Sequence, residues 1–259
     1  MNIQTLVVTT DQKDYSLLKK MNIQTPAIVG NQCDRDEIEE FSYGGNPVKW
    51  LSLHERGVGL NRNTVLMRSE ADVCVLADDD MVFIDGYEKV VSDLFDRYPH
   101  TDVLIFNLNQ KSPTIYKNSN VKKIHRFNYG KYGAARLAFR RESVQFNNIC
   151  FHLLFGGGAK YSSGEDSIFL YECLKRKLRV LAVPVAIAEL TSDRESTWFQ
   201  GYTDDFFFDK GVFYYALDRN MGRFIALYNC FKHRNSRYKQ YGWKKAYRQM
   251  LRGIHSVKK

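Results

Sequence analysis

The feature that most constrains this chain is a regular alternation of short apolar runs with stretches of helical spacing over its first 110 residues. We expect strands at residues 5–9, 27–29, 48–53, 72–77 and 102–107, with helices at 15–21, 61–69 and 86–98 between them. Strands that alternate with helices predict βαβ units and a mostly parallel sheet. Such sheets bind ligands at the carboxyl ends of their strands, where this sequence places polar residues.

The rest of the chain continues the pattern and then changes character. We expect strands at residues 133–140 and 179–188 and a helix at 166–177, followed by an aromatic-rich stretch. A chain of 259 residues suits one large α/β domain, and no low-complexity linker interrupts it. We therefore predict one domain at residues 1–200 and a C-terminal extension at residues 201–259.

The charge of the chain is unevenly distributed. Its 38 Lys and Arg against 29 Asp and Glu give a net charge of +9, but residues 219–259 hold twelve Lys and Arg and no acidic residue. The first 218 residues therefore carry 26 basic and 29 acidic side chains, a net charge of −3. Binding of a polyanion over the whole surface is excluded, and we expect no nucleic-acid partner.

Two further properties narrow the class of protein. No stretch reaches the roughly 18 apolar residues that span a membrane, and the sequence is polar again by Asp11, so we expect a cytoplasmic protein without a signal peptide. Five widely spaced cysteines without a CxxC pair indicate reduced thiols, not disulfides or a zinc site. Cys74 and Cys173 lie in apolar stretches and are expected in the core.

Three consecutive carboxylates, Asp78, Asp79 and Asp80, follow the apolar run that ends at residue 77. Adjacent carboxylates repel one another unless a cation or solvent relieves them. Oxygen-rich sites of this kind suit Mg²⁺ or Mn²⁺, which share their coordination with substrate phosphates. The alternative is a solvated acidic turn.

A glycine- and arginine-containing segment, residues 56–63, lies about twenty residues upstream of the three carboxylates. Its glycines allow close backbone approach, and a helix that begins there would direct N–H groups, Arg56 and Arg62 toward an anion. Glycine before a helix is common, so the segment is weak evidence alone. Combined with the acidic cluster, it predicts a site for a nucleotide diphosphate.

A third segment, residues 156–166, is rich in glycine and serine and ends in Glu165 and Asp166 at the start of a helix. Acidic residues in a first helical turn complement the helix dipole, which is a sufficient structural reason for them. The functional alternative is that one carboxylate faces a cavity as a general base.

Together the three segments resemble the GT-A glycosyltransferases, in particular the inverting glycosyltransferase family 2. The resemblance covers residues 3–198. Residues 78–80 are similar to the family's DxD motif, residues 57–63 to its G…ARN segment with Asn61 in place of Ala, and residues 165–166 to its ED motif. The resemblance implies a GT-A fold, which is a mixed and mostly parallel sheet flanked by helices. In this chain a basic helical extension would follow it.

The resemblance also implies roles for individual residues. The donor nucleotide would be bound by Thr9, Thr10, Asp34, Arg56, Gly57, Arg62, Asp78 and Asp79. The metal ion, Mn²⁺ or Mg²⁺, would be held by Asp80 and Asp78. The catalytic base would be Asp166, with Glu165. Many relatives supply a metal-binding His after the strand that follows the ED helix. The corresponding residues 188–193 contain none, and Glu189 or Asp193 is the expected replacement.

The implied function is inverting transfer of a sugar from a nucleotide-diphosphate sugar, in particular a UDP-sugar, to a glycan or lipid-linked acceptor in surface polysaccharide synthesis. Trp198 is the candidate for stacking on the acceptor. Residues 219–259 suit an anionic membrane, on the inner face of a bacterial plasma membrane, or a helix packed on the body of the protein. The alternatives are a sugar-phosphate nucleotidyltransferase and a non-catalytic protein that binds glycans or polyanions.

Overall fold

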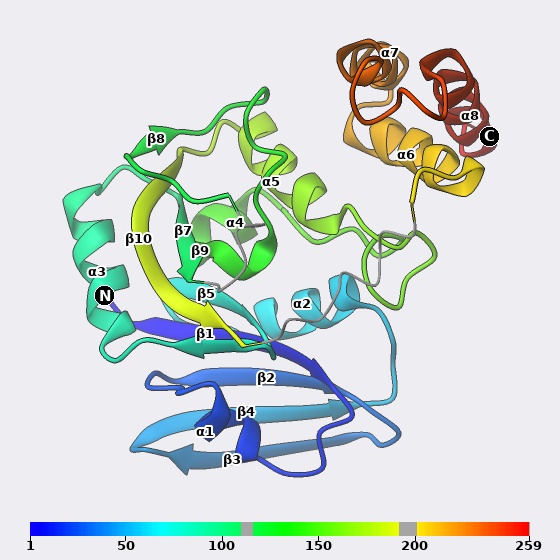
Figure 1. The fold of residues 1–259 in the computed structure, drawn as a ribbon. Coiled ribbons are helices and arrows are strands. Elements are labelled where there is room, and N and C mark those ends of the chain that lie inside the picture. Colours follow the sequence, from blue (N-terminus) through cyan, green and yellow to red (C-terminus); the bar gives the residue numbers. More distant parts are fainter. Residues whose placement is uncertain (110–115, 192–200, 259) are drawn as a thin grey trace. The chain divides into compact units, whose positions relative to one another are not determined.

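In the computed structural model, which describes residues 1–109, 116–191 and 201–258, a ten-stranded sheet organises the first of two units. Unit 1 is Met1–Asp193 and unit 2 is Arg194–Lys259. The strands of unit 1 are β1 (Ile3–Thr10), β2 (Ala27–Gln32), β3 (Glu37–Tyr43), β4 (Asn46–Leu53), β5 (Val73–Asp78), β6 (Met81–Phe83), β7 (Val103–Asn109), β8 (Lys122–Lys123), β9 (Leu137–Arg140) and β10 (Val180–Leu190). Their order is β3-β4-β2-β1-β5-β9-β7-β10-β6, and β8 pairs with β10 (Figure 1).

The sheet is mixed and mostly parallel, as predicted. Strands β4, β2, β1 and β5 are joined by parallel pairings, as are β7 and β10. Strand β9 runs antiparallel between β5 and β7, which leaves those two strands pointing the same way. The carboxyl ends of these six parallel strands therefore meet at one edge of the sheet, where a ligand site is expected.

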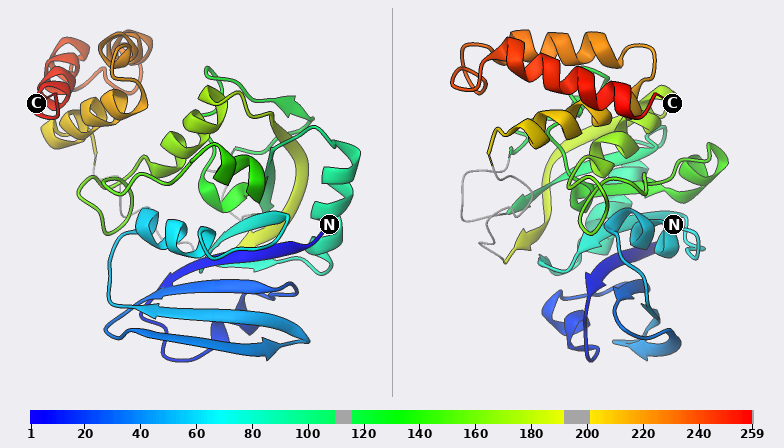
Figure 2. Two further views of the ribbon diagram at one scale, coloured as in Figure 1. Left: turned by 180° about the vertical axis from the view of Figure 1, so that it is seen from behind. Right: turned by 90° about the vertical axis from the view of Figure 1, so that its right-hand side faces the viewer.

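Helices cover both faces of the sheet (Figure 2). On one face, α1 (Ser16–Lys20) and α3 (Tyr87–Arg97) contribute buried side chains to one apolar cluster. On the other, α2 (Val58–Leu66), α4 (Arg141–Phe146) and α5 (Glu165–Lys175) contribute to a second cluster. Cys74 and Cys173 are fully buried in this second cluster, which confirms their predicted place in the core. The predicted α/β fold, a mostly parallel sheet flanked by helices, is thus confirmed.

Several elements differ from the sequence-based expectation, in which β3, β6, β8 and α4 were absent. Strand β3 was not predicted, because its charged residues obscure the alternation, yet it forms a hairpin with β4. Gly44 and Gly45 connect the two strands with φ of +58° and +83°, as a tight two-residue hairpin requires. The strand expected at residues 133–140 begins only at Leu137, because Ala134–Arg136 forms a short 3₁₀ helix.

Unit 2 contains the helices α6 (Asp204–Leu217), α7 (Gly222–His233) and α8 (Trp243–Ser256). Two glycines allow α6 and α8 to approach closely. A Cβ on Gly211 of α6 would lie 2.0 Å from the carbonyl oxygen of Met250, and a Cβ on Gly253 of α8 would lie 2.0 Å from that of Phe208. Among the described residues, no helix is long and apolar enough to cross a membrane.

Candidate active site

Arg62 brings together carboxylates from two of the three sequence segments. Its side chain, on α2, is only 4% exposed and donates from Nη2 to Oδ1 of Asp78 at 2.9 Å. Its Nη1 atom lies 3.1 Å from Oε1 of Glu165 and 2.6 Å from Oδ1 of Asp166. Asp78 ends β5, whereas Glu165 and Asp166 open α5. One buried guanidinium therefore joins the acidic motif to the ED pair.

Backbone geometry next to this cluster requires glycine. Gly156 has φ of +102°, a region that other residues rarely adopt, and a Cβ there would lie 2.7 Å from Cδ of Glu165. The same Cβ would lie 2.5 Å from a methyl group of Val58 on α2. The glycine-rich loop thus lets the Glu165 carboxyl group pack directly against the backbone.

The charges of the cluster perturb one another. Burial alone would lower the pKa of Arg62, but the three nearby carboxylates outweigh burial and raise it. Burial raises the pKa of Glu165 to about 7, repulsion from Asp166 adds to this, and Arg62 offsets part of it. Burial also raises the pKa of Asp78, against the effect of Arg62. Since the Asp78 side chain is 37% exposed, water weakens this shift. Glu165 can therefore bind a proton near neutral pH.

Asp166 has two carboxylate oxygens in different surroundings. Arg62 holds Oδ1, whereas Oδ2 lies where a Cβ on Gly133 would be 3.2 Å away. The side chain is 28% exposed, more than the 11% of Glu165. A general base must be both oriented and accessible to its substrate, and Asp166 meets these conditions better than Glu165.

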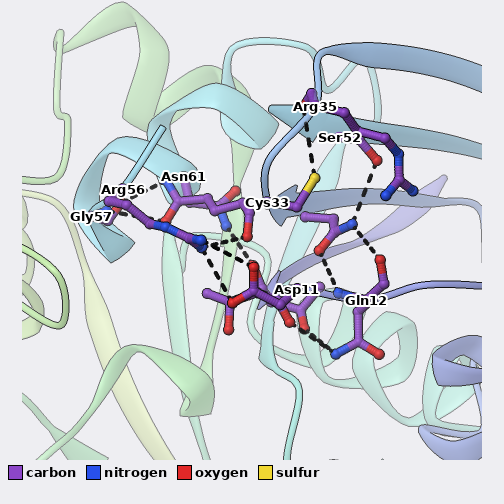
Figure 3. A network of polar contacts seen from close by, with 12 residues as sticks. Asp11, Gln12, Cys33, Arg35, Ser52, Arg56, Gly57 and Asn61 are labelled. Carbon is purple, nitrogen blue, oxygen red and sulfur yellow. Dashed lines mark hydrogen bonds and ion pairs between the residues drawn. The ribbon is translucent and has the colours of Figure 1, made fainter. Parts of the chain in front are cut away.

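Polar residues line the carboxyl ends of β1 and β2 (Figure 3). Arg56 forms an ion pair with Asp11 at 3.0 Å and donates to the carbonyl oxygen of Gln32 at 2.7 Å. The side chain of Gln32 accepts from the N–H of Gly57 at 3.0 Å. Figure 3 shows Arg56 reaching from the start of α2 toward Asp11. Asp11 and Gln32 were not among the predicted site residues, although Asp11 directly follows β1 and Gln32 is the last residue of β2.

A second set of contacts connects β1 to the acidic motif. The hydroxyl of Thr9 donates to Oδ2 of Asp79 at 2.7 Å and accepts from Nε2 of Gln12 at 3.0 Å. The backbone N–H of Gln12 donates to Oδ1 of the buried Asn31 at 2.9 Å. Thr10 is exposed at the end of β1. Thr9 and Asp79, which are both expected in the donor site, are therefore in direct contact.

Asn61, which stands in place of the Ala of the motif that the sequence resembles, ties α2 to the sheet. Its amide group donates to the carbonyl oxygen of Gly30 at 2.8 Å and to that of Thr9 at 3.3 Å, so it ties α2 to β1 and β2. A Cβ on Gly30 would lie 1.8 Å from Oδ1 of Asn61. The larger side chain thus fits because its neighbour is glycine.

The start of α2 differs from the expectation in two ways. The helix begins at Val58 instead of residue 61, and the N–H of Val58 donates to the carbonyl oxygen of Gly157 at 2.9 Å. Arg62 was expected to face phosphates, but it is buried among three carboxylates. The reason is that α2 turns Arg62 inward toward α5, while Arg56, before the helix, remains half exposed.

The candidate metal ligands are spread over two elements. The main-chain carbonyl of Asp80 accepts from the backbone N–H and the hydroxyl of Thr191, and Glu189 is exposed on β10 opposite Val82 of β6. Within the described ranges, no three His, Cys, Asp or Glu side chains form a group that could hold a metal ion. Asp34 is exposed after β2. Asp193 and Trp198 lie outside the described residues.

No protein-family model and no curated protein sequence matches the chain. Its structure is similar to that of Staphylococcus aureus TarS residues 1–349 with UDP-GlcNAc, with a TM-score of 0.66 and 17% identity over 98% of this chain and 82% of that chain. The same TarS fragment with UDP gives a TM-score of 0.62 and 16% identity over 92% and 73%. The fold of the chain is therefore similar to that of TarS. A longer TarS structure has a TM-score of 0.63 and 17% identity over 92% of this chain, which spans 45% of that one.

Proposed function

We propose that the protein is a glycosyltransferase that moves a sugar from a nucleotide-diphosphate sugar, in particular a UDP-sugar, to an acceptor hydroxyl. The observation that carries this proposal is the position of Arg62, which holds the first Asp of the DxD-like motif and both residues of the ED-like motif. The fold likeness to TarS, whose structures include complexes with UDP-GlcNAc and UDP, supports the choice of donor.

In the proposed mechanism, Asp166 removes the proton from the acceptor hydroxyl. Arg62 holds Oδ1 of its carboxylate, and the absence of a side chain at Gly133 leaves room beside Oδ2. An acceptor that attacks the anomeric carbon from the face opposite the leaving nucleotide gives inversion of configuration. Glu165, whose pKa is raised to about 7, limits the negative charge beside Asp166. We therefore propose, more specifically, that the enzyme inverts the configuration at the anomeric carbon, as family 2 glycosyltransferases do.

The residues at the end of β5 suit a divalent metal that is held largely by the substrate. By the resemblance to the DxD motif, Asp80 is the proposed principal ligand, with Glu189 of β10, the strand that pairs with β6, as a second. Mg²⁺ commonly binds one or two carboxylates together with phosphates and water, which fits this donor set. When bound, Mn²⁺ or Mg²⁺ would neutralise charge on the diphosphate.

The proposed acceptor is a glycan or lipid-linked glycan in surface polysaccharide synthesis, met at the inner face of a bacterial plasma membrane. The proposed donor site uses Thr9 at the end of β1, Asp79 just after β5, and Arg56 and Gly57 just before α2. Asp79 is joined to Thr9, and Arg56 and Gly57 to Gln32 of β2, by hydrogen bonds. Thr10 and Asp34 are exposed beside the same strand ends. Ligands of parallel sheets bind at this edge.

The test is hydrolysis of nucleotide-sugars by the full chain with Mn²⁺. Slow release of nucleoside diphosphate, lost in Asp166→Asn, is the expected result. Release of pyrophosphate on incubation of a nucleoside triphosphate with a sugar phosphate would identify a nucleotidyltransferase instead. Binding of glycans without turnover of any donor would identify a non-catalytic binding protein.

A further inference from the structure

Helix α7 of unit 2 presents a stripe of large apolar side chains to solvent. Met221, Phe224, Leu227, Tyr228 and Phe231 are 50%, 65%, 40%, 66% and 54% exposed. They recur every third or fourth residue, which places them on one face of the helix. We call these five residues the α7 stripe. Large exposed apolar patches on a protein surface usually mark a site of interaction.

The opposite face of α7 is already occupied. Gly222, Ala226 and Cys230 are buried, and α7 contacts both α6 and α8 within unit 2. The α7 stripe is therefore not the face with which the helix packs in its own unit. It remains available for a partner.

Helix α8, in contrast, uses its apolar face internally. The sequence suggested that its mixture of basic and aromatic residues could contact a membrane, but Ala246, Met250 and Ile254 are buried. The close approach at Gly211 and Gly253 packs this face against α6. Within residues 219–259, which the sequence proposes as a whole for membrane contact, the structure thus favours α7 over α8 as the candidate membrane-binding surface.

Basic residues border the α7 stripe. Arg223 and Lys232 are exposed on α7, and the guanidinium carbon of Arg234 lies 3.8 Å from the ring centre of Phe231. Residues 219–259 hold twelve Lys and Arg and no Asp or Glu. An apolar stripe flanked by cations suits an anionic lipid surface, because the apolar side chains enter the acyl boundary while the cations meet the headgroups.

We propose that α7 lies in the plane of an anionic membrane and docks the protein there through the α7 stripe. A 12-residue helix is about 18 Å long, too short to span a bilayer but long enough to lie in its interface. A second copy of the chain is a poorer occupant, because Arg223, Lys232 and Arg234 of one copy would face the same cations of the other and repel them. The inference deepens the proposed function by naming the surface that brings the enzyme to a lipid-linked acceptor.

The test is sedimentation of the full chain with vesicles of phosphatidylcholine that contain phosphatidylglycerol. The wild type is expected to bind these vesicles, with little binding to phosphatidylcholine alone and with weaker binding at high salt. The double variant Phe224→Ala/Phe231→Ala should lose about tenfold or more in vesicle affinity, because two exposed rings no longer enter the lipid. Phe224 and Phe231 are both more than half exposed, so the variant should remain folded, which circular dichroism checks, with only the contact between Arg234 and Phe231 lost.

The matched control is Phe146→Ala, which removes an 89% exposed ring from α4 of unit 1 and should leave vesicle binding unchanged. Equal vesicle affinity of wild type and double variant would overturn the proposal. So would a wild-type dimer that the double variant abolishes while vesicles bind neither protein, since the stripe would then serve self-association. Because lipid binding is measured without a donor, the proposal can fail independently of the glycosyltransferase assignment.

Discussion

The Nη1 atom of Arg62 lies 2.6 Å from Oδ1 of Asp166, although the two residues are more than 100 positions apart in the sequence. The second arm of the same guanidinium reaches Asp78 at the end of β5. Arg62 is therefore the residue through which α2, β5 and α5 share one electrostatic cluster. Its charge both stabilises the fold and orients the proposed base.

Arg62→Met is expected to destabilise the protein by about 3 kcal/mol or more, because removal of one partner from a buried ion cluster leaves uncompensated charges. Urea unfolding at pH 7 measures this loss. Arg56→Met, which removes the half-exposed pair with Asp11, is the control and should cost about 1 kcal/mol or less. Equal losses in the two variants would show that the cluster around Arg62 contributes no special stability.

Glu165→Gln is expected to change how stability depends on pH. The pKa of Glu165 is raised from 4.5 to about 7 by folding, so between these values the native state binds more protons than the unfolded state. The free energy of unfolding of the wild type should then fall as pH rises from 4.5 to 7, and this contribution should vanish in Glu165→Gln. Denaturant unfolding at pH 5 and pH 8 measures the difference.

Glu172→Gln is the matched control for this pH dependence. Glu172 lies on the same helix and forms an ion pair with Lys175 near the surface. The variant should keep the wild-type slope. If the free energy of unfolding of Glu165→Gln still falls as pH rises from 4.5 to 7, the titrating group is another residue.

Asp166→Asn is expected to lower sugar transfer by about 10²-fold or more, since an amide cannot accept the acceptor's proton. Donor binding should remain close to that of the wild type, because the amide oxygen can still accept from Arg62. Steady-state kinetics and calorimetry with a nucleotide-sugar separate the two effects. Loss of donor binding together with transfer would make Asp166 a structural residue.

Asp80→Ala is expected to abolish stimulation of donor binding by Mn²⁺, and EDTA should have the same effect on the wild type. Thermal-shift measurements with UDP, with and without Mn²⁺, report this directly, because a ligand that binds the native state raises its stability. Activity that is unchanged by EDTA would exclude the proposed metal.

Gly211→Ala is expected to destabilise unit 2 by about 1–3 kcal/mol, because its Cβ would overlap the backbone of Met250 and force α6 away from α8. Thermal unfolding followed by circular dichroism measures the loss. Gly130→Ala is the control, since nothing lies within 4 Å of a Cβ at that position. A wild-type melting temperature for Gly211→Ala would mean that the two helices separate without cost.

Local signals in the sequence predicted much of the fold. Apolar runs and helical spacing located β1, β2, β4, β5, β7 and β10 and the helices α1, α2, α3 and α5, because these elements bury continuous apolar surface that the sequence records directly. Strand β3 was missed because its alternation is weak and its two-glycine turn was the main signal. The ends of α2 and β9 were misplaced, since contacts from distant loops decide where those elements begin.

The sequence by itself predicted that carboxylates and polar residues gather at the carboxyl ends of parallel strands, because strands that alternate with helices favour a mostly parallel sheet. Only the tertiary structure decided which of these groups meet. Arg62 faces Glu165 and Asp166 instead of solvent because the fold brings the first turn of α5 to α2, which are far apart in the chain. In unit 2, α7 and α8 both carry apolar and basic residues, and the sequence does not rank them. The glycines at 211 and 253 bury the apolar face of α8 against α6, which leaves the α7 stripe exposed.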